Sequence, residues 1–156
     1  MSSLTRPRID LTAKCACGQC SVTVHGPALV MLLCSCEDCQ KSSGTGHSAV
    51  SFVDANNVTV TGETTQYSRP ADSGATFTRH FCPRCGTPLY GQSSRAPRFR
   101  MLPVGLFGDR SEWFRPSQLI FARTHREWDT VAEDLPQHLA YRIKSETRQE
   151  QPEPAK

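Results

Sequence analysis

Large apolar side chains are scarce in this chain of 156 residues, because Leu, Ile, Val and Phe together account for only 30 of them. Small cores of this kind often depend on covalent or metal crosslinks. Long apolar runs are also missing: the longest, Ala28 to Leu33, is far too short to cross a membrane. The composition therefore predicts a domain that is stabilised by something besides apolar burial, with no membrane partner.

An excess of charge of one sign is lacking as well. The net charge is only +3, from 18 basic and 15 acidic residues, which is less than expected of a protein that wraps nucleic acid. Residues 1–14 contain no apolar stretch of the kind found in a secretory signal. We therefore expect a cytoplasmic protein without a nucleic-acid partner, in a compartment where thiols stay reduced.

Cysteine, by contrast, is abundant, and eight cysteines in a chain of this size call for an explanation. They form three clusters: Cys15-Ala-Cys17-Gly-Gln-Cys20, Cys34-Ser-Cys36-Glu-Asp-Cys39 and Cys82-Pro-Arg-Cys85. In a reducing compartment, clustered thiols bind metal more often than they pair as disulfides.

The pair Cys82 and Cys85 is typical of a zinc knuckle, in which two thiolates on a tight turn reach one ion. Gly86 can adopt the positive φ that such a turn needs. Cys15 and Cys17 would face the same side of an extended segment, so they can supply the other two ligands of a closed structural site. A redox dithiol is the less favoured alternative, because the βαβ context of such motifs is missing.

The middle cluster has a different character. Cys34, Cys36 and Cys39 can hold one metal with the fourth position open, which is the pattern of a catalytic zinc. A second structural site, closed by Cys20 or by a histidine such as His47, fits the spacing almost equally well. For Cys20 we favour a place in the apolar core over a role as ligand.

Short alternating segments between turn residues predict a mainly β fold of antiparallel sheets with few helices. The expected strands cover Ser21–Val24, Ala49–Val53, Val58–Thr61, Ala75–Phe81 and Gln118–Ala122. Short helices are expected only after Cys36 and around Pro136–Ile143. We expect one zinc-binding β domain over residues 12–143, between a loosely held segment over residues 1–11 and a disordered tail over residues 144–156.

The three cysteine motifs, in this order, resemble those of the glutathione-dependent formaldehyde-activating enzymes, a family that includes centromere-protein-V-like proteins. The matching stretches run from Cys15 to Val24, from Cys34 to Gly44 and from Arg79 to Tyr90, and a late segment from Pro116 to Pro136 is similar as well. The resemblance implies antiparallel sheets of the β-tent type around a structural zinc.

The resemblance also implies two zinc ions per chain. The structural ion would be bound by Cys15, Cys17, Cys82 and Cys85. A second, more labile ion that takes part in the chemistry would be bound by Cys34, Cys36 and Cys39.

The activity that the resemblance implies is of the carbon–sulfur lyase type. Glutathione, or a similar thiol, would combine reversibly with formaldehyde to give S-(hydroxymethyl)glutathione, and metal binding would favour the thiolate. Lys41, Arg79 and Arg95 are candidates to pair with the carboxylates of the thiol, and His47 is a candidate acid or base. Solvated surface charges and a structural histidine are the more common roles of such residues. The alternative function is a zinc-stabilised scaffold without catalysis, which a fourth protein ligand at the second site would favour.

Overall fold

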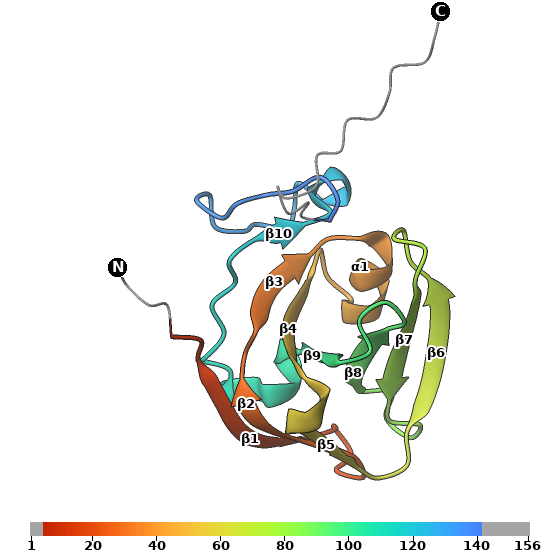
Figure 1. Ribbon diagram of the computed structural model, residues 1–156. Coiled ribbons are helices and arrows are strands. Elements are labelled where there is room, and N and C mark those ends of the chain that lie inside the picture. Colours follow the sequence, from red (N-terminus) through yellow and green to blue (C-terminus); the bar gives the residue numbers. More distant parts are fainter. Residues whose placement is uncertain (1–4, 142–156) are drawn as a thin grey trace, which may run out of the picture.

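The computed structural model describes residues 5–141, and these residues form two β-sheets (Figure 1). The smaller sheet has the order β1-β2-β5, with β1 (Arg8–Lys14), β2 (Ser21–Pro27) and β5 (Val58–Thr61). The larger sheet has the order β10-β3-β4-β9-β8-β7-β6. Its strands are β3 (Val30–Cys34), β4 (Ser48–Asp54), β6 (Thr65–Pro70), β7 (Thr76–Phe81), β8 (Pro88–Ser93), β9 (Phe99–Pro103) and β10 (Leu119–Ile120).

The strands pair antiparallel throughout, except that β10 runs parallel to β3. One α-helix, α1 (Glu37–Ser43), follows β3, and short 3-10 helices cover Ala55–Asn57, Val104–Arg110 and Ala122–Thr124. The prediction of a mainly β fold with antiparallel sheets and few helices is confirmed. No helix within residues 5–141 combines the length and the apolar character that crossing a bilayer requires.

The first strand, β1, is not among the strands that the sequence predicts. β1 starts at Arg8, within the range 1–11 that the sequence suggested to be loosely held, because Ile9 and Ala13 are buried against β2. The predicted tail over residues 144–156 lies outside the described residues. Residues 8–11 thus belong to a sheet, and the domain boundaries at residues 12 and 143 stay a prediction.

The segment after residue 118 departs from the prediction in two ways. The expected strand Gln118–Ala122 shortens to β10, because Phe121 turns the chain with a left-handed φ of 57°. The expected helix around Pro136–Ile143 was wrong over residues 136–141. There the backbone pairs with β10 instead, with Leu119 N–H donating to the Pro136 carbonyl at 2.8 Å and His138 N–H donating to the Leu119 carbonyl at 2.9 Å.

Two apolar clusters position the cysteines. The larger one is formed by side chains of both sheets and contains three cysteines: Ile9, Ala13, Cys15, Cys20, Val22, Val24, Ala28, Val53, Cys82, Leu89, Leu102 and Phe107. The smaller one contains Leu32, Cys34, Ile120 and Phe121. In Figure 1 the helix α1 lies above the strands β7 and β8, and the turn that joins these two strands lies below them, so the two cysteine clusters occupy separate parts of the fold.

Candidate metal centres and active site

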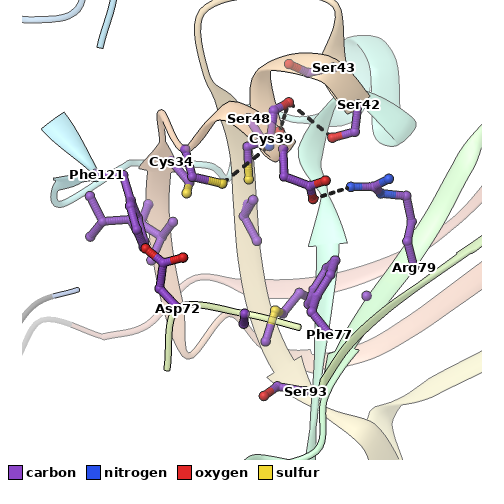
Figure 2. A pocket seen from close by; sticks show the side chains of 18 of the residues that line it. Cys34, Cys39, Ser42, Ser43, Ser48, Asp72, Phe77, Arg79, Ser93 and Phe121 are labelled. Carbon is purple, nitrogen blue, oxygen red and sulfur yellow. Dashed lines mark hydrogen bonds and ion pairs between the residues drawn. The ribbon is translucent and has the colours of Figure 1, made fainter. Parts of the chain in front are cut away.

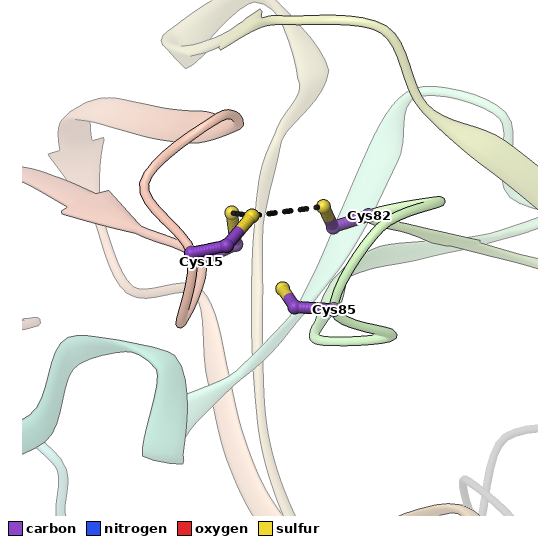
Figure 3. Close-up of side chains that lie close together, drawn as sticks. Cys15, Cys82 and Cys85 are labelled. Carbon is purple, nitrogen blue, oxygen red and sulfur yellow. Dashed lines mark hydrogen bonds between the residues drawn. The ribbon is translucent and has the colours of Figure 1, made fainter.

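The first cluster unites cysteines from two distant turns (Figure 3). Cys15 and Cys17 lie between β1 and β2, and Cys82 and Cys85 lie between β7 and β8. All four sulfur atoms lie within 4.8 Å of one another. The Sγ atoms of Cys15 and Cys17 are 3.6 Å apart, and those of Cys17 and Cys82 are 3.7 Å apart. Gly86 ends the second turn with a φ of 75°, as the knuckle prediction required.

The surroundings of this cluster favour ionisation of Cys15 and Cys85 but not of Cys17. A backbone hydrogen bond from Gln19 lowers the pKa of Cys17, but burial and hydrogen bonds with the other three thiols outweigh it and raise that pKa to about 11. The Thr87 hydroxyl, 3.1 Å from Cys85 Sγ, together with backbone hydrogen bonds from Thr87 and Cys17, lowers the pKa of the Cys85 thiol to about 5. The Cys20 N–H donates to Cys15 Sγ at 3.2 Å. Several thiolates this close repel one another unless a cation lies between them. The four cysteines could therefore hold a metal ion, and four sulfur donors are compatible with zinc.

Cys20 has a separate role. Its side chain is only 1% exposed, packs within the larger apolar cluster and donates to the Glu63 carbonyl at 3.2 Å. It does not belong to the group of four sulfur atoms that converge. The prediction that Cys20 is a core residue is confirmed.

The second cluster is built by the turn from β3 into α1. Cys34 ends β3, Cys36 is the N-cap of α1, and Cys39 lies in the first turn of that helix. The Cys36 sulfur accepts the Cys39 N–H at 3.3 Å, which is how an N-cap side chain satisfies a free donor at the start of a helix. The three sulfur atoms lie within 4.8 Å of one another, and within residues 5–141 the group of metal-ligating side chains stops at these three.

Negative charge within the second cluster is distributed unequally among the three thiols. Hydrogen bonds with Cys34 and Cys39 lower the pKa of the Cys36 thiol, while hydrogen bonds with Cys36 and Cys39 raise the pKa of Cys34. Without a cation, the cluster therefore carries its negative charge mainly on one sulfur. A cation would allow the other thiols to ionise, which fits a set of donors for a metal.

The second cluster opens into a cavity of about 710 Å³, which α1, β4 and β6 to β9 enclose together with the segment after β10. An ion-pair network lies at its rim. Asp38 Oδ2 accepts a hydrogen bond from Arg79 Nη2 at 3.0 Å and another from Arg69 Nε. Figure 2 shows the Arg79 guanidinium turned toward a carboxylate of the helix. All three side chains are partly buried, so the cavity has a charged side next to the cysteines.

Of the four polar residues that the sequence suggested for substrate binding or acid–base chemistry, two line the cavity and two do not. Lys41 and Arg79 line it, whereas Arg95 and His47 lie outside its lining. His47 Nδ1 is 2.6 Å from Asp129 Oδ2, so its imidazole is held by a carboxylate away from the cysteines. This arrangement favours the structural role of His47 over the catalytic one.

Arg69 and Asp38 are the site residues that sequence reasoning missed. Arg69 is an isolated arginine at the penultimate position of β6, and Asp38 is one of two acidic residues in the first turn of a helix. Their juxtaposition depends on the pairing of β6 with β7 and on the packing of α1. No local pattern in the sequence signals it.

A sequence model of the family described as glutathione-dependent formaldehyde-activating enzyme matches residues 10–124. The chain belongs to this family. The resemblance noted from the cysteine motifs is thus confirmed. Two relatives, each described as a putative glutathione-dependent formaldehyde-activating enzyme, come from Penicillium rubens and Sordaria macrospora.

The Penicillium rubens relative is 33% identical over 92 residues, which cover 59% of this chain and 48% of that protein. The Sordaria macrospora relative is 30% identical over 102 residues, which cover 62% of this chain and 43% of that protein. The chain thus spans about half the length of the curated relatives that it matches. A crystal structure of a Rhodobacter sphaeroides protein superposes with a TM-score of 0.51 at 17% identity, covering 64% of this chain and 89% of that one. This last likeness concerns the fold alone.

Proposed function

We propose that this family member is a zinc-dependent enzyme of the carbon–sulfur lyase type, which forms and cleaves a thiol–aldehyde adduct such as S-(hydroxymethyl)glutathione. Membership of the family supports glutathione-dependent formaldehyde activation. The observation that carries the proposal is the contrast between the two clusters. Four converging sulfur atoms are typical of a closed structural site, whereas three that open on a cavity of about 710 Å³ leave room for a substrate. A cytoplasmic location, where the thiols stay reduced, belongs to the proposal.

The chain holds the three proposed ligands firmly. The hydroxyls of Ser42 and Ser48 both donate to the Cys39 carbonyl, at 3.1 and 3.2 Å. Gln40 Nε2 donates to the carbonyls of Ser35 and Thr124, which ties α1 to the segment after β10. Such supporting contacts orient metal ligands. A bound zinc would supply a position at which an incoming thiol ionises and a centre that polarises an aldehyde oxygen.

The charged rim gives the thiol its orientation. Asp38 neutralises one of two guanidinium groups, so Arg69 and Arg79 together keep a surplus positive charge beside the cysteines. Lys41 adds another cation to the cavity lining. Glutathione carries two carboxylates, and an arginine fork binds a carboxylate through two parallel hydrogen bonds. We infer that this rim holds a carboxylate of the thiol.

Replacing Arg79 with methionine is expected to raise the KM for glutathione about tenfold, with a smaller effect on kcat. A hydrogen bond between charged groups contributes roughly 1.5–3 kcal/mol, and partial exposure places Arg79 at the lower end. Steady-state kinetics on the zinc-loaded protein measures this. Arg98→Met is the matched control, because Arg98 stacks on Phe99 outside the cavity lining. An unchanged KM for Arg79→Met would contradict the proposal that Arg79 binds a carboxylate of the thiol.

Metal content is the simplest check on the proposed cofactor. We expect about two zinc ions per chain after purification without chelators, because seven cysteines form two ligand sets. Elemental analysis with thiol titration measures this. A protein without zinc, whose thiols are paired as disulfides, would contradict both metal assignments.

The proposed reaction can be followed directly by NMR exchange spectroscopy. We expect zinc-loaded protein to accelerate exchange between free glutathione and S-(hydroxymethyl)glutathione in a mixture with formaldehyde. An unchanged exchange rate would exclude the formaldehyde reaction. X-ray absorption spectroscopy on zinc-loaded protein without added glutathione addresses the scaffold alternative. A fourth protein ligand at the second metal would favour that alternative.

A further inference from the structure

We propose that the aldehyde half of the natural substrate carries an apolar group of several carbons, which lies against the cavity wall beside Cys34. This inference rests on the proposed function, since it concerns the substrate of the same site. Formaldehyde contributes a single carbon to the adduct. It therefore leaves an apolar wall without a partner.

The first observation is the chemical character of the wall. Cys34 belongs to an apolar cluster with Leu32, Ile120 and Phe121, and Val50 packs against it. All of these side chains also line the cavity. The wall next to this proposed ligand is therefore mainly apolar, although the ion pair between Arg123 and Asp72 also lines the cavity beside Phe121. Covering the apolar part with an apolar group removes it from water. Glutathione itself, which is polar and doubly carboxylated, is suited to the arginine side instead.

The second observation is the conformation of Phe121. Its backbone adopts φ 57° and ψ 39°, and it is the one non-glycine residue with positive φ within residues 5–141. Bulky side chains rarely occupy this region, and such strain often accompanies a functional role. The ring is only 5% exposed and meets Tyr141 edge to face, with centroids 4.8 Å apart. The strained backbone thus presents an aromatic ring at the cavity wall.

The third observation is the order of the groups across the site. In Figure 2 the sulfur atoms of Cys34 and Cys39 lie between Phe121 on one side and Arg79 on the other. A thiol whose carboxylate is held at Arg79 would place its sulfur near the cysteines. Bond formation between that sulfur and the carbonyl carbon moves the thiol proton to the carbonyl oxygen and gives a hemithioacetal. The substituent of the former aldehyde then extends toward Phe121.

The size of the cavity agrees with a substrate whose carboxylate lies at Arg79 and whose apolar group lies at Phe121. Cavities of roughly 300–1,000 Å³ take ligands of drug size, and this one measures about 710 Å³. There is thus room for a tripeptide thiol together with an aliphatic or aromatic group. We name the class as alkyl or aryl aldehydes.

The test compares binding of S-hexylglutathione and S-methylglutathione to zinc-loaded protein by titration calorimetry. Each buried methylene strengthens binding roughly fourfold, so burial of part of the hexyl chain predicts a Kd at least tenfold lower than that of the methyl conjugate. Val50→Phe fills the wall without creating a void and should reduce this ratio to less than threefold. Val30→Phe is the matched control, because Val30 is exposed on β3 outside the cavity lining, and it should keep the ratio.

Equal Kd values for the two conjugates in the unmodified protein would overturn the inference, as would failure of both to bind. A ratio that Val50→Phe leaves unchanged would overturn it too. Exchange spectroscopy with formaldehyde and with hexanal separates this result from the proposed function. If formaldehyde exchange is accelerated and the conjugates bind equally, the enzyme proposal stands and the apolar substituent is wrong. If the hexyl conjugate binds preferentially but neither aldehyde exchanges faster, the apolar subsite stands and the catalytic proposal fails.

Discussion

Replacing Cys82 with serine is expected to abolish cooperative folding of the domain. Cys82 is fully buried, and its sulfur lies within the group of four that unites the β1–β2 turn with the β7–β8 turn. Structural zinc sites contribute about 10–16 kcal/mol in small peptides, which is comparable to the whole stability of a typical domain. With so few large apolar residues in the chain, the core has little reserve to offset such a loss.

The length of the closed loop adds to this effect. A metal held by Cys15 and Cys85 ties together positions about seventy residues apart, and closing a long loop removes more entropy from the unfolded chain than closing a short one. Thermal melts followed by circular dichroism, with zinc analysis of the same samples, measure the outcome. A cooperative melt of the Cys82→Ser variant within a few degrees of the unmodified protein would contradict a structural metal at this cluster.

The cysteine clusters were predictable because their information is local. Two cysteines on a tight turn already form half of a site, and the structure places the two halves together. The helix after Cys36 was likewise predictable, since it has a capping side chain, acidic residues in its first turn and a left-handed glycine, Gly44, at its end. Neighbouring residues thus specify the helix and each half of the four-cysteine site, whereas the meeting of the two halves depends on the fold.

Other parts of the fold depend on distant partners. The apolar run Val30–Cys34 lacks the alternation that identifies a half-buried strand, because β3 is a central strand between β4 and β10. The helix expected around Pro136 gives way to backbone pairing with Leu119, so tertiary contacts override local propensity. The contact of Arg69 with Asp38 likewise exists only once β6 and α1 are assembled.

Replacing Cys36 with serine is expected to abolish the thiol–aldehyde exchange while leaving the fold nearly unchanged. The three proposed ligands span six residues of one turn, so a metal there closes only a short loop and adds little to stability. Serine is also a favoured N-cap residue, so its hydroxyl can replace the sulfur that accepts the Cys39 N–H. The start of α1, and with it the cavity wall, should therefore persist.

Three measurements on the Cys36→Ser variant decide between a catalytic and a structural second site. We expect a melting temperature within a few degrees of the unmodified protein, about one zinc ion per chain fewer, and an exchange rate equal to that without protein. Cys82→Ser is the contrasting variant, because it removes a ligand of the other cluster. If both replacements collapse the fold to the same extent, the second metal is structural too. Cys34, Cys36 and Cys39 would then stabilise a scaffold, and the cavity beside them would have to serve a ligand that does not react.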